Sequence, residues 1–350
     1  MARRRQRALA ALAVFACTLL ALPIVVGRVL GEPRAEALEA KWRDFENGAD
    51  EYDVVFIGTS HVQRHVDPRR VDEVLTARGI IARSYNFGLP KMSILEGLEL
   101  VERLERRRPR RLKFVVIEPT LYLYDTDNWA SDRAIAGHDW RNTALAIRLT
   151  WSSEARRQAG FWGKVASIRP HVLSFLCRYF NLGRGWLVFS QAKESPEREG
   201  SADVPVSDSR GFAALPNVPP PAGGELGEWQ RRFLRFLEIE PDWKGRGLSV
   251  AEIAYFDWLL ERIRQTGAQP VFLLGPKVKR DSHTAAVLST HGERYGKVPL
   301  LNHLRGHGED DLYQLCYWHD FDHLNADGAT LFSCRLGADI SRLFRGIVSR

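Results

Sequence analysis

Short, uninterrupted runs of apolar residues alternate with amphipathic segments over much of this chain, and that alternation constrains its fold more than any other feature. An unbroken apolar run is typical of a strand whose two faces are both buried in a parallel sheet. Strands that alternate with helices favour a doubly wound α/β fold. Five strands are expected, at residues 52–58, 82–88, 112–119, 269–276 and 297–303.

Helix boundary signals separate these strands. Asp67 and Pro68 suit the start of a helix over 66–79, because an Asp side chain caps free N–H groups and proline fits the first turn. Two more starts carry a capping box, in which a Ser and a Glu three residues later each bond the other's backbone N–H. Further helices are expected at 93–109, 249–265 and 326–344.

The alternation stops between residues 121 and 245, which hold seven of the ten Trp and a Pro/Gly-rich stretch at 216–225. We interpret residues 121–245 as a helical, Trp-rich insertion with a Pro/Gly loop. The insertion divides a single α/β domain into residues 51–120 and 246–350. Its aromatic side chains either form a core of their own or lie on a membrane or a membrane partner.

The N-terminus joins four arginines to an apolar run without charge at 8–27. This run has the length that spans a bilayer, and the preceding positive charges hold the N-terminus in the cytoplasm. A cleaved signal peptide has the same layout, but its apolar core is usually shorter. We therefore expect a signal anchor or transmembrane helix at 1–28, a helical connector at 29–50 and an exported remainder.

Charge and cysteine content exclude several function classes. The net charge is +7, and the four N-terminal arginines supply much of it, so nucleic-acid binding is not expected. No CxxC spacing occurs among the four cysteines, so we expect neither a zinc site nor any other metal or cofactor. In an exported chain, two of Cys177, Cys316 and Cys334 could pair, or all three could be buried thiols.

The residues that could carry chemistry lie where the expected strands end, which is the edge where doubly wound sheets bind ligands. Ser60 follows the first strand. A serine hydroxyl becomes a nucleophile only beside a base that a carboxylate orients, and His323 and Asp320 could supply both from one loop. The backbone N–H groups of Ser60 and Gly88 could stabilise an oxyanion from neighbouring strand ends.

Other roles for these side chains stay open. Asp322 competes with Asp320 for the orienting role; adjacent residues of an extended loop face opposite ways, so only one of the two should face His323. His319 and His323 could instead bind a metal together with both carboxylates, but so many ligands within five residues would be crowded. His61 could contact a substrate or serve only to hold the start of a helix.

Three short motifs resemble the SGNH (GDSL-like) hydrolase superfamily. They are IGTSH at 57–61, NFG at 86–88 and DFDHLNADGA at 320–329. The chain is most similar to the membrane-anchored, exported branch that includes D-alanyl transfer and alginate O-acetylation proteins. The resemblance implies a flavodoxin-like, three-layer α/β/α fold, with Ser60 as nucleophile, Asp320 and His323 completing a triad, and Gly88 as an oxyanion donor. The family spacing favours Asp320 over Asp322 for the orienting role.

The chain departs from the SGNH pattern after the third strand, where the family normally offers an Asn side chain to the oxyanion. The sequence IEPT at 117–120 places Glu118 and Thr120 there. An ionised Glu would oppose a developing oxyanion. Either Thr120 or Asn128 acts as the substitute donor, or the site works in a different way.

The resemblance implies a serine esterase or O-acyltransferase that acts on acyl esters of cell-envelope carbohydrate. Its partners would be an envelope polysaccharide and a membrane-bound O-acyltransferase. Its location would be the bacterial inner membrane, with the C-terminal domain in the periplasm. The alternative is a catalytically inactive, carbohydrate-binding or assembly factor of an envelope polysaccharide pathway, and Glu118 is the observation that favours it.

Overall fold

The computed structural model describes most of the chain as two compact units. One comprises residues 1–36 and 124–200, and the other comprises 37–123 and 201–350. The residues described are 2–30, 35–123, 128–152, 160–181, 209–217, 226–239, 243, 247–278, 282–306 and 310–348.

The second unit contains the expected parallel sheet, built from five strands in the order β2-β1-β3-β4-β5. All four neighbouring pairs are parallel, and Val54 of β1 lies between Ser84 of β2 and Phe114 of β3. This is the strand order of flavodoxin-like doubly wound sheets. The strands are β1 (Val54–Ile57), β2 (Ser84–Asn86), β3 (Phe114–Ile117), β4 (Gln269–Leu274) and β5 (Leu300–Asn302).

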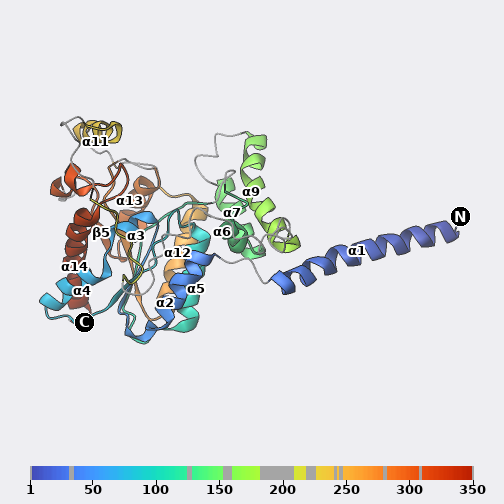
Figure 1. The fold of residues 1–350 in the computed structure, drawn as a ribbon, viewed down its shortest axis with the longest axis horizontal. Coiled ribbons are helices and arrows are strands. Elements are labelled where there is room, and N and C mark those ends of the chain that lie inside the picture. Colours follow the sequence, from blue (N-terminus) through green and yellow to red (C-terminus); the bar gives the residue numbers. More distant parts are fainter. Residues whose placement is uncertain are drawn as a thin grey trace. The chain divides into compact units, whose positions relative to one another are not determined.

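Helices cover both faces of the sheet (Figure 1). On one face, α14 (Ala326–Val348) packs on α3 (Ser60–His65) and α4 (Pro68–Ala77). On the other face, α5 (Ile94–Arg107) packs on α12 (Val250–Gln265). Successive strand residues point to opposite faces of the sheet. Because helices cover both faces, all four residues of β1 and of β3 are buried.

The local signals in the sequence have the expected effect on helix boundaries. Asp67 accepts a hydrogen bond from the Arg69 N–H and Pro68 opens α4. Ser93 and Ser249 each begin a helix with a complete capping box. The predicted helix over 66–79 is therefore confirmed as α4, but the separate short helix α3 before it was not predicted.

The compact α/β unit includes residues 201–245, which the sequence analysis assigned to the insertion. The backbone continues the sheet edge here, because Asn86 N donates to Arg210 O and Ala213 N donates to Gln63 O, both at 3.0 Å. The same unit contains α2 (Glu36–Glu46) from residue 37 onward, α11 (Glu228–Glu238), α13 (Ser282–Arg294) and three 3-10 turns, η1 (Ala49–Glu51), η3 (Asp310–Leu312) and η4 (Leu315–Tyr317).

Lys41 of α2 ties three distant segments of the α/β unit together. Its side chain is buried, and Nζ donates to the carbonyls of Asn86 at 3.1 Å, Gly88 at 2.6 Å and Gly211 at 2.6 Å. Burial lowers the pKa of Lys41 to about 7. The carbonyls have no other described donor of this strength, so this one side chain stabilises the edge of the sheet next to β2.

The first unit is helical, as predicted for the insertion. Here α9 (Phe161–Phe180) packs on α6 (Asp132–Gly137) and α7 (Trp140–Ser152), and α1 (Ala2–Leu30) contacts α9. A buried chain of hydrogen bonds joins these helices: His138 Nε2 meets His171 Nδ1, and His171 Nε2 meets Thr150 Oγ1, each at 3.0 Å. Most of the predicted Pro/Gly loop lies outside the described residues.

The apolar run at 8–27 lies within α1. In the part of the chain that the structure describes, no helix is both long enough and apolar enough to cross a membrane. The predicted N-terminal anchor thus has no support from the structure and stays a prediction.

Candidate active site

Ser60 stands at the carboxyl edge of the sheet, on a sharp connection from β1 into α3. Gly58 is required there, because a Cβ atom would come within 2.3 Å of Val62 Cγ2 and 2.7 Å of Glu118 Cβ. Thr59 caps α3, with its side chain accepting from the His61 N–H, and Ser60 is the first helical residue. The close approach that glycine permits turns the Ser60 hydroxyl out of the strand direction and toward the loop before α14.

That loop supplies the two other members of a triad. His323 Nε2 lies 2.9 Å from Ser60 Oγ. On the other side of the ring, His323 Nδ1 lies 3.1 and 3.0 Å from the two carboxylate oxygens of Asp320. A carboxylate accepts only, so Nδ1 carries a proton and the neutral ring presents an acceptor nitrogen to the serine. This is the arrangement in which a histidine can remove the serine proton.

Asp320, rather than Asp322, orients the ring. Asp320 Oδ1 also accepts the backbone N–H groups of Asp322 at 2.7 Å and His323 at 2.8 Å. Partial burial opposes ionisation of Asp320, but the His323 ring and these N–H groups outweigh it and hold its pKa at about 2. The carboxylate is therefore charged at neutral pH and fixed in place by the turn it closes.

A second histidine, which the sequence reasoning missed, holds the two parts of the triad together. His65 ends α3, and its Nε2 accepts the N–H of Leu324 at 3.0 Å. Ser333 of α14 donates to the His65 carbonyl at 3.1 Å and accepts the N–H of Asp67 at 2.8 Å. Both ends of the short helix α3 thus contact the segment that carries His323, which fixes the distance from Ser60 to its base.

His65 is held in the neutral form. It is fully buried, and burial lowers its pKa well below the ordinary value, with His61 and His323 adding to the effect. Because Nε2 accepts a hydrogen bond, Nδ1 carries the proton, yet this nitrogen has no hydrogen-bond partner among the described residues. The ring centroids of His61 and His323 lie 5.3 and 6.1 Å from that of His65.

The N–H of Gly88, predicted as an oxyanion donor, is bonded to a neighbouring side chain in this structure. It donates to Asn86 Oδ1 at 2.7 Å, so it is not available to an oxyanion in this geometry. Asn86 Nδ2 in turn donates to the carbonyls of Val62 and Val66, both at 2.7 Å, which ties β2 to α3. Gly88 is needed for a close approach instead, since a Cβ there would lie 2.2 Å from Gln63 N.

Glu118 is buried at the end of β3, and its two oxygens are occupied. Oε2 accepts both the N–H and the hydroxyl of Thr59 at 2.7 Å. Oε1 lies 3.0 Å from His61 Nδ1 and 3.9 Å from Lys277 Nζ. Burial alone would raise the pKa of Glu118, but the charges of His61 and Lys277 and these hydrogen bonds hold it well below the ordinary value. Glu118 is therefore an anion that cations and donors already surround.

The two remaining predicted donors are not brought to Ser60 by any described contact. Thr120 Oγ1 accepts the N–H of Tyr122 at 3.2 Å. Asn128 belongs to the other unit, and its prediction as a donor stays untested. The role of an oxyanion donor is thus still unassigned beyond the Ser60 N–H, which has no acceptor among the described residues.

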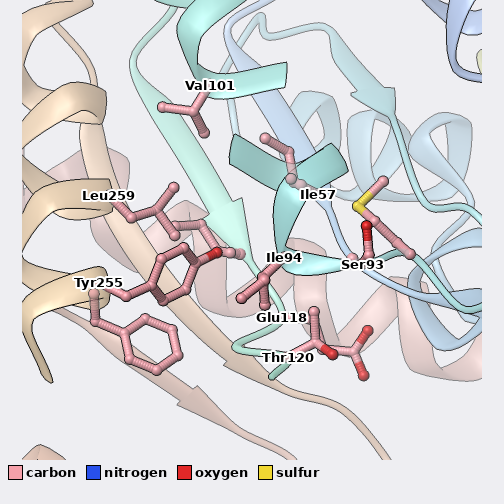
Figure 2. A pocket seen from close by; sticks show the side chains of 13 residues that line it. Ile57, Ser93, Ile94, Val101, Glu118, Thr120, Tyr255 and Leu259 are labelled. Carbon is pink, nitrogen blue, oxygen red and sulfur yellow. The ribbon is translucent and has the colours of Figure 1, made fainter. Parts of the chain in front are cut away.

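A small cavity of about 10 Å³ lies between the sheet and the α5–α12 layer, next to Glu118. Figure 2 shows Tyr255 and Leu259 of α12 on one side of it and Glu118 with Thr120 on another. The cavity has room for about one water molecule. Ser60 does not line it. The lining residues are Ile57, Gly58, Met92, Ser93, Ile94, Gly97, Val101, Ile117, Glu118, Thr120, Tyr255, Phe256 and Leu259.

His319 does not join the triad. Its Nδ1 lies 2.9 Å from the carbonyl oxygen of Pro216, and the residue is half-buried. Across the described residues, no group of three or more His, Cys, Asp or Glu side chains could hold a metal ion. The four cysteines are free thiols, so no disulfide joins any two of Cys177, Cys316 and Cys334.

Comparison of the chain with models of known protein families and with curated proteins finds no match. The resemblance to SGNH hydrolases therefore rests on the short motifs alone, and the site has to be interpreted from its own geometry. The site contains two imidazole–carboxylate pairs, His323 with Asp320 and His61 with Glu118. The two imidazole rings contact each other.

Proposed function

We propose that this protein is a serine ester hydrolase or O-acyltransferase of SGNH-like type, acting on acyl esters of cell-envelope carbohydrate. The observation that carries the proposal is the contact of Ser60 Oγ with His323 Nε2 at 2.9 Å, with Asp320 on the opposite ring nitrogen. The two halves of this contact are 263 residues apart in the chain, so chance proximity along the backbone does not explain it.

In the proposed reaction, Ser60 Oγ attacks the acyl carbon of an ester while its proton passes to His323 Nε2. Asp320 stabilises the imidazolium that results. The tetrahedral intermediate then collapses, the ester C–O bond breaks, and the leaving alcohol takes the proton from His323. Water or a sugar hydroxyl next gives its proton to His323 and attacks the acyl-serine, which releases the acid or the new ester and restores Ser60.

The carbohydrate substrate, the membrane-bound acyltransferase partner and the exported location belong to the same proposal. They rest on the SGNH-like motifs and on the arginine-led apolar run at 8–27. The choice between water and a sugar hydroxyl as acceptor is a matter for the assay, since both need the same base.

The test is to treat the full-length chain with a fluorophosphonate and to map the adduct by mass spectrometry. We expect an adduct on Ser60 that is absent from Ser60→Ala and slowed at least about 100-fold in His323→Ala. His319→Ala is the matched control, because His319 lies in the same loop, and its ring bonds the Pro216 carbonyl rather than Ser60.

Folded wild-type protein that forms no Ser60 adduct, and does not hydrolyse p-nitrophenyl acetate, would contradict the proposal. Binding of an acylated polysaccharide by such inert protein would support the alternative, a non-catalytic carbohydrate-binding or assembly factor. Equal loss of labelling in His319→Ala and His323→Ala would show that the loop matters only for folding.

A further inference from the structure

We propose that His61, held by Glu118, is a further catalytic residue that donates a hydrogen bond from Nε2 to the oxyanion formed at Ser60. This inference rests on the proposed acyl-transfer function and deepens it. It assigns a side-chain oxyanion donor in place of the Asn that the SGNH pattern has and this chain lacks. It also makes Glu118 a residue that positions this donor rather than one that opposes the oxyanion.

The first step concerns Glu118. An ionised carboxylate beside a developing oxyanion is unfavourable only if its charge is not compensated. Here Thr59 donates twice to Oε2, and His61 and Lys277 face Oε1. Glu118 is only 6% exposed, so its charge is stabilised by these groups rather than by water. Its charge is directed at His61 and Lys277, and its oxygens have no room for another partner.

The second step concerns the His61 ring. Nδ1 lies 3.0 Å from Glu118 Oε1, so this nitrogen carries a proton and Nε2 is the one that can face a substrate. Nε2 has no hydrogen-bond partner among the described residues, and the side chain is 22% exposed. The ring therefore has one nitrogen fixed to a buried anion and the other without a partner among the described residues.

The third step concerns charge. Four ionisable groups lie around His61. Two of them, Glu118 at the end of β3 and Lys277 after β4, form an ion pair with each other. The other two are His65, which burial keeps neutral, and His323, whose ring centroid lies 5.7 Å away. The nearest charge to His61 is thus the Glu118 carboxylate, which forms an ion pair with the ring when both ring nitrogens carry a proton. An imidazolium presents an N–H at Nε2.

The fourth step concerns position. His61 follows Ser60 directly in α3, and its ring contacts that of His323, the base for Ser60. An ester carbonyl attacked by Ser60 Oγ is within reach of both the Ser60 N–H and the His61 ring. With Gly88 N–H bonded to Asn86, the His61 ring is the candidate side-chain donor on the residue next to the nucleophile.

Three substitutions at His61 separate donation from a structural role. In Gln, the amide nitrogen takes the place of Nε2, whereas in Asn it takes the place of Nδ1 and keeps only the contact with Glu118. We expect His61→Ala and His61→Asn to lower kcat for p-nitrophenyl acetate about 100-fold or more, with KM changed less than about 3-fold. We expect His61→Gln to recover kcat about 10-fold relative to His61→Asn.

The opposite order, with His61→Asn equal to or more active than His61→Gln, would mean that His61 only holds the helix start, and would overturn the inference. So would kcat in His61→Ala within about 3-fold of wild type. Both results leave the proposed function intact, because wild-type turnover and labelling of Ser60 are measured in the same experiment. A wild type without turnover overturns both proposals together.

Glu118→Gln gives a second test, in which the sign of the effect decides. If Glu118 keeps His61 protonated, the neutral amide lowers kcat, and we expect a loss of about 10-fold or more. If the charge of Glu118 instead opposes the oxyanion, the same change raises kcat. Circular dichroism and the melting temperature of each variant check that α3 and its cap at Thr59 are intact.

Discussion

Asp320→Asn is the change that probes the triad most directly. Asp320 Oδ1 accepts two backbone N–H groups, and both oxygens face His323 Nδ1. An Asn keeps those two backbone bonds only if its oxygen stays in the Oδ1 position, which turns its NH₂ group toward Nδ1. Two donors cannot face each other, so the ring proton moves to Nε2. His323 can then no longer accept the proton of Ser60.

The magnitude follows from this wrong tautomer, which lowers kcat by up to about 10⁴-fold in serine hydrolases. The Asp320 side chain is 45% exposed, so water can partly replace its contact with the ring, and we expect a loss of about 10³-fold. The measurement is kcat for p-nitrophenyl acetate, with KM nearly unchanged. Asp322→Asn is the matched control, and we expect it to retain kcat within about 2-fold. Activity of Asp320→Asn within 10-fold of wild type, or equal losses in both variants, would refute this reasoning.

Gly58→Ala should destabilise the chain by about 1–3 kcal/mol in urea unfolding and slow Ser60 labelling, because the new Cβ overlaps α3 and Glu118; Gly275→Ala, at a strand end with open space, should do neither. Lys41→Met should lower the free energy of unfolding by about 3 kcal/mol or more, since three buried carbonyls lose a charged donor, whereas the exposed Lys113→Met should change it little. Burial lowers the pKa of His171 to about 4, so between pH 6.5 and 4 the unfolded chain binds a proton that the folded one does not. The first unit should therefore lose stability as pH falls through that window, and His171→Gln should flatten the dependence; a urea midpoint that does not change from pH 7.5 to 5 would contradict this.

Local patterns were enough to predict the sheet and most helices around it. The apolar run at 54–57 is buried on both faces, and the capping boxes at Ser93 and Ser249 start their helices where expected. In contrast, α3 could not be recognised, because the residue buried at its end is His65 rather than an apolar one. A helix of six residues is also too short for a hydrophobic period to be visible.

The triad residues could be predicted because each lies beside a recognisable boundary, either a strand end or the start of a terminal helix. Their supporting contacts could not. The N–H of Gly88 is bonded by the side chain of Asn86, two residues away, and no sequence pattern distinguishes that from an open donor. Glu118 looked unfavourable for the same reason, since its partners Thr59 and Lys277 lie in the segments that follow two other strands, β1 and β4. The end of the insertion could not be placed from the sequence, because residues 210–213 contact the sheet edge mainly through backbone atoms, beside the Arg210–Asp72 ion pair.

The long sequence separation between Ser60 and His323 has a consequence for the nascent chain during synthesis. At roughly 5–20 residues per second, the ribosome needs about 10–50 s after making Ser60 before it makes its base, 263 residues later. Docking of α14 onto α3 and α4 then has to follow. Throughout that time the nascent chain carries an ordinary alcohol at Ser60, so the proposed ester chemistry could begin only when the last helix is in place.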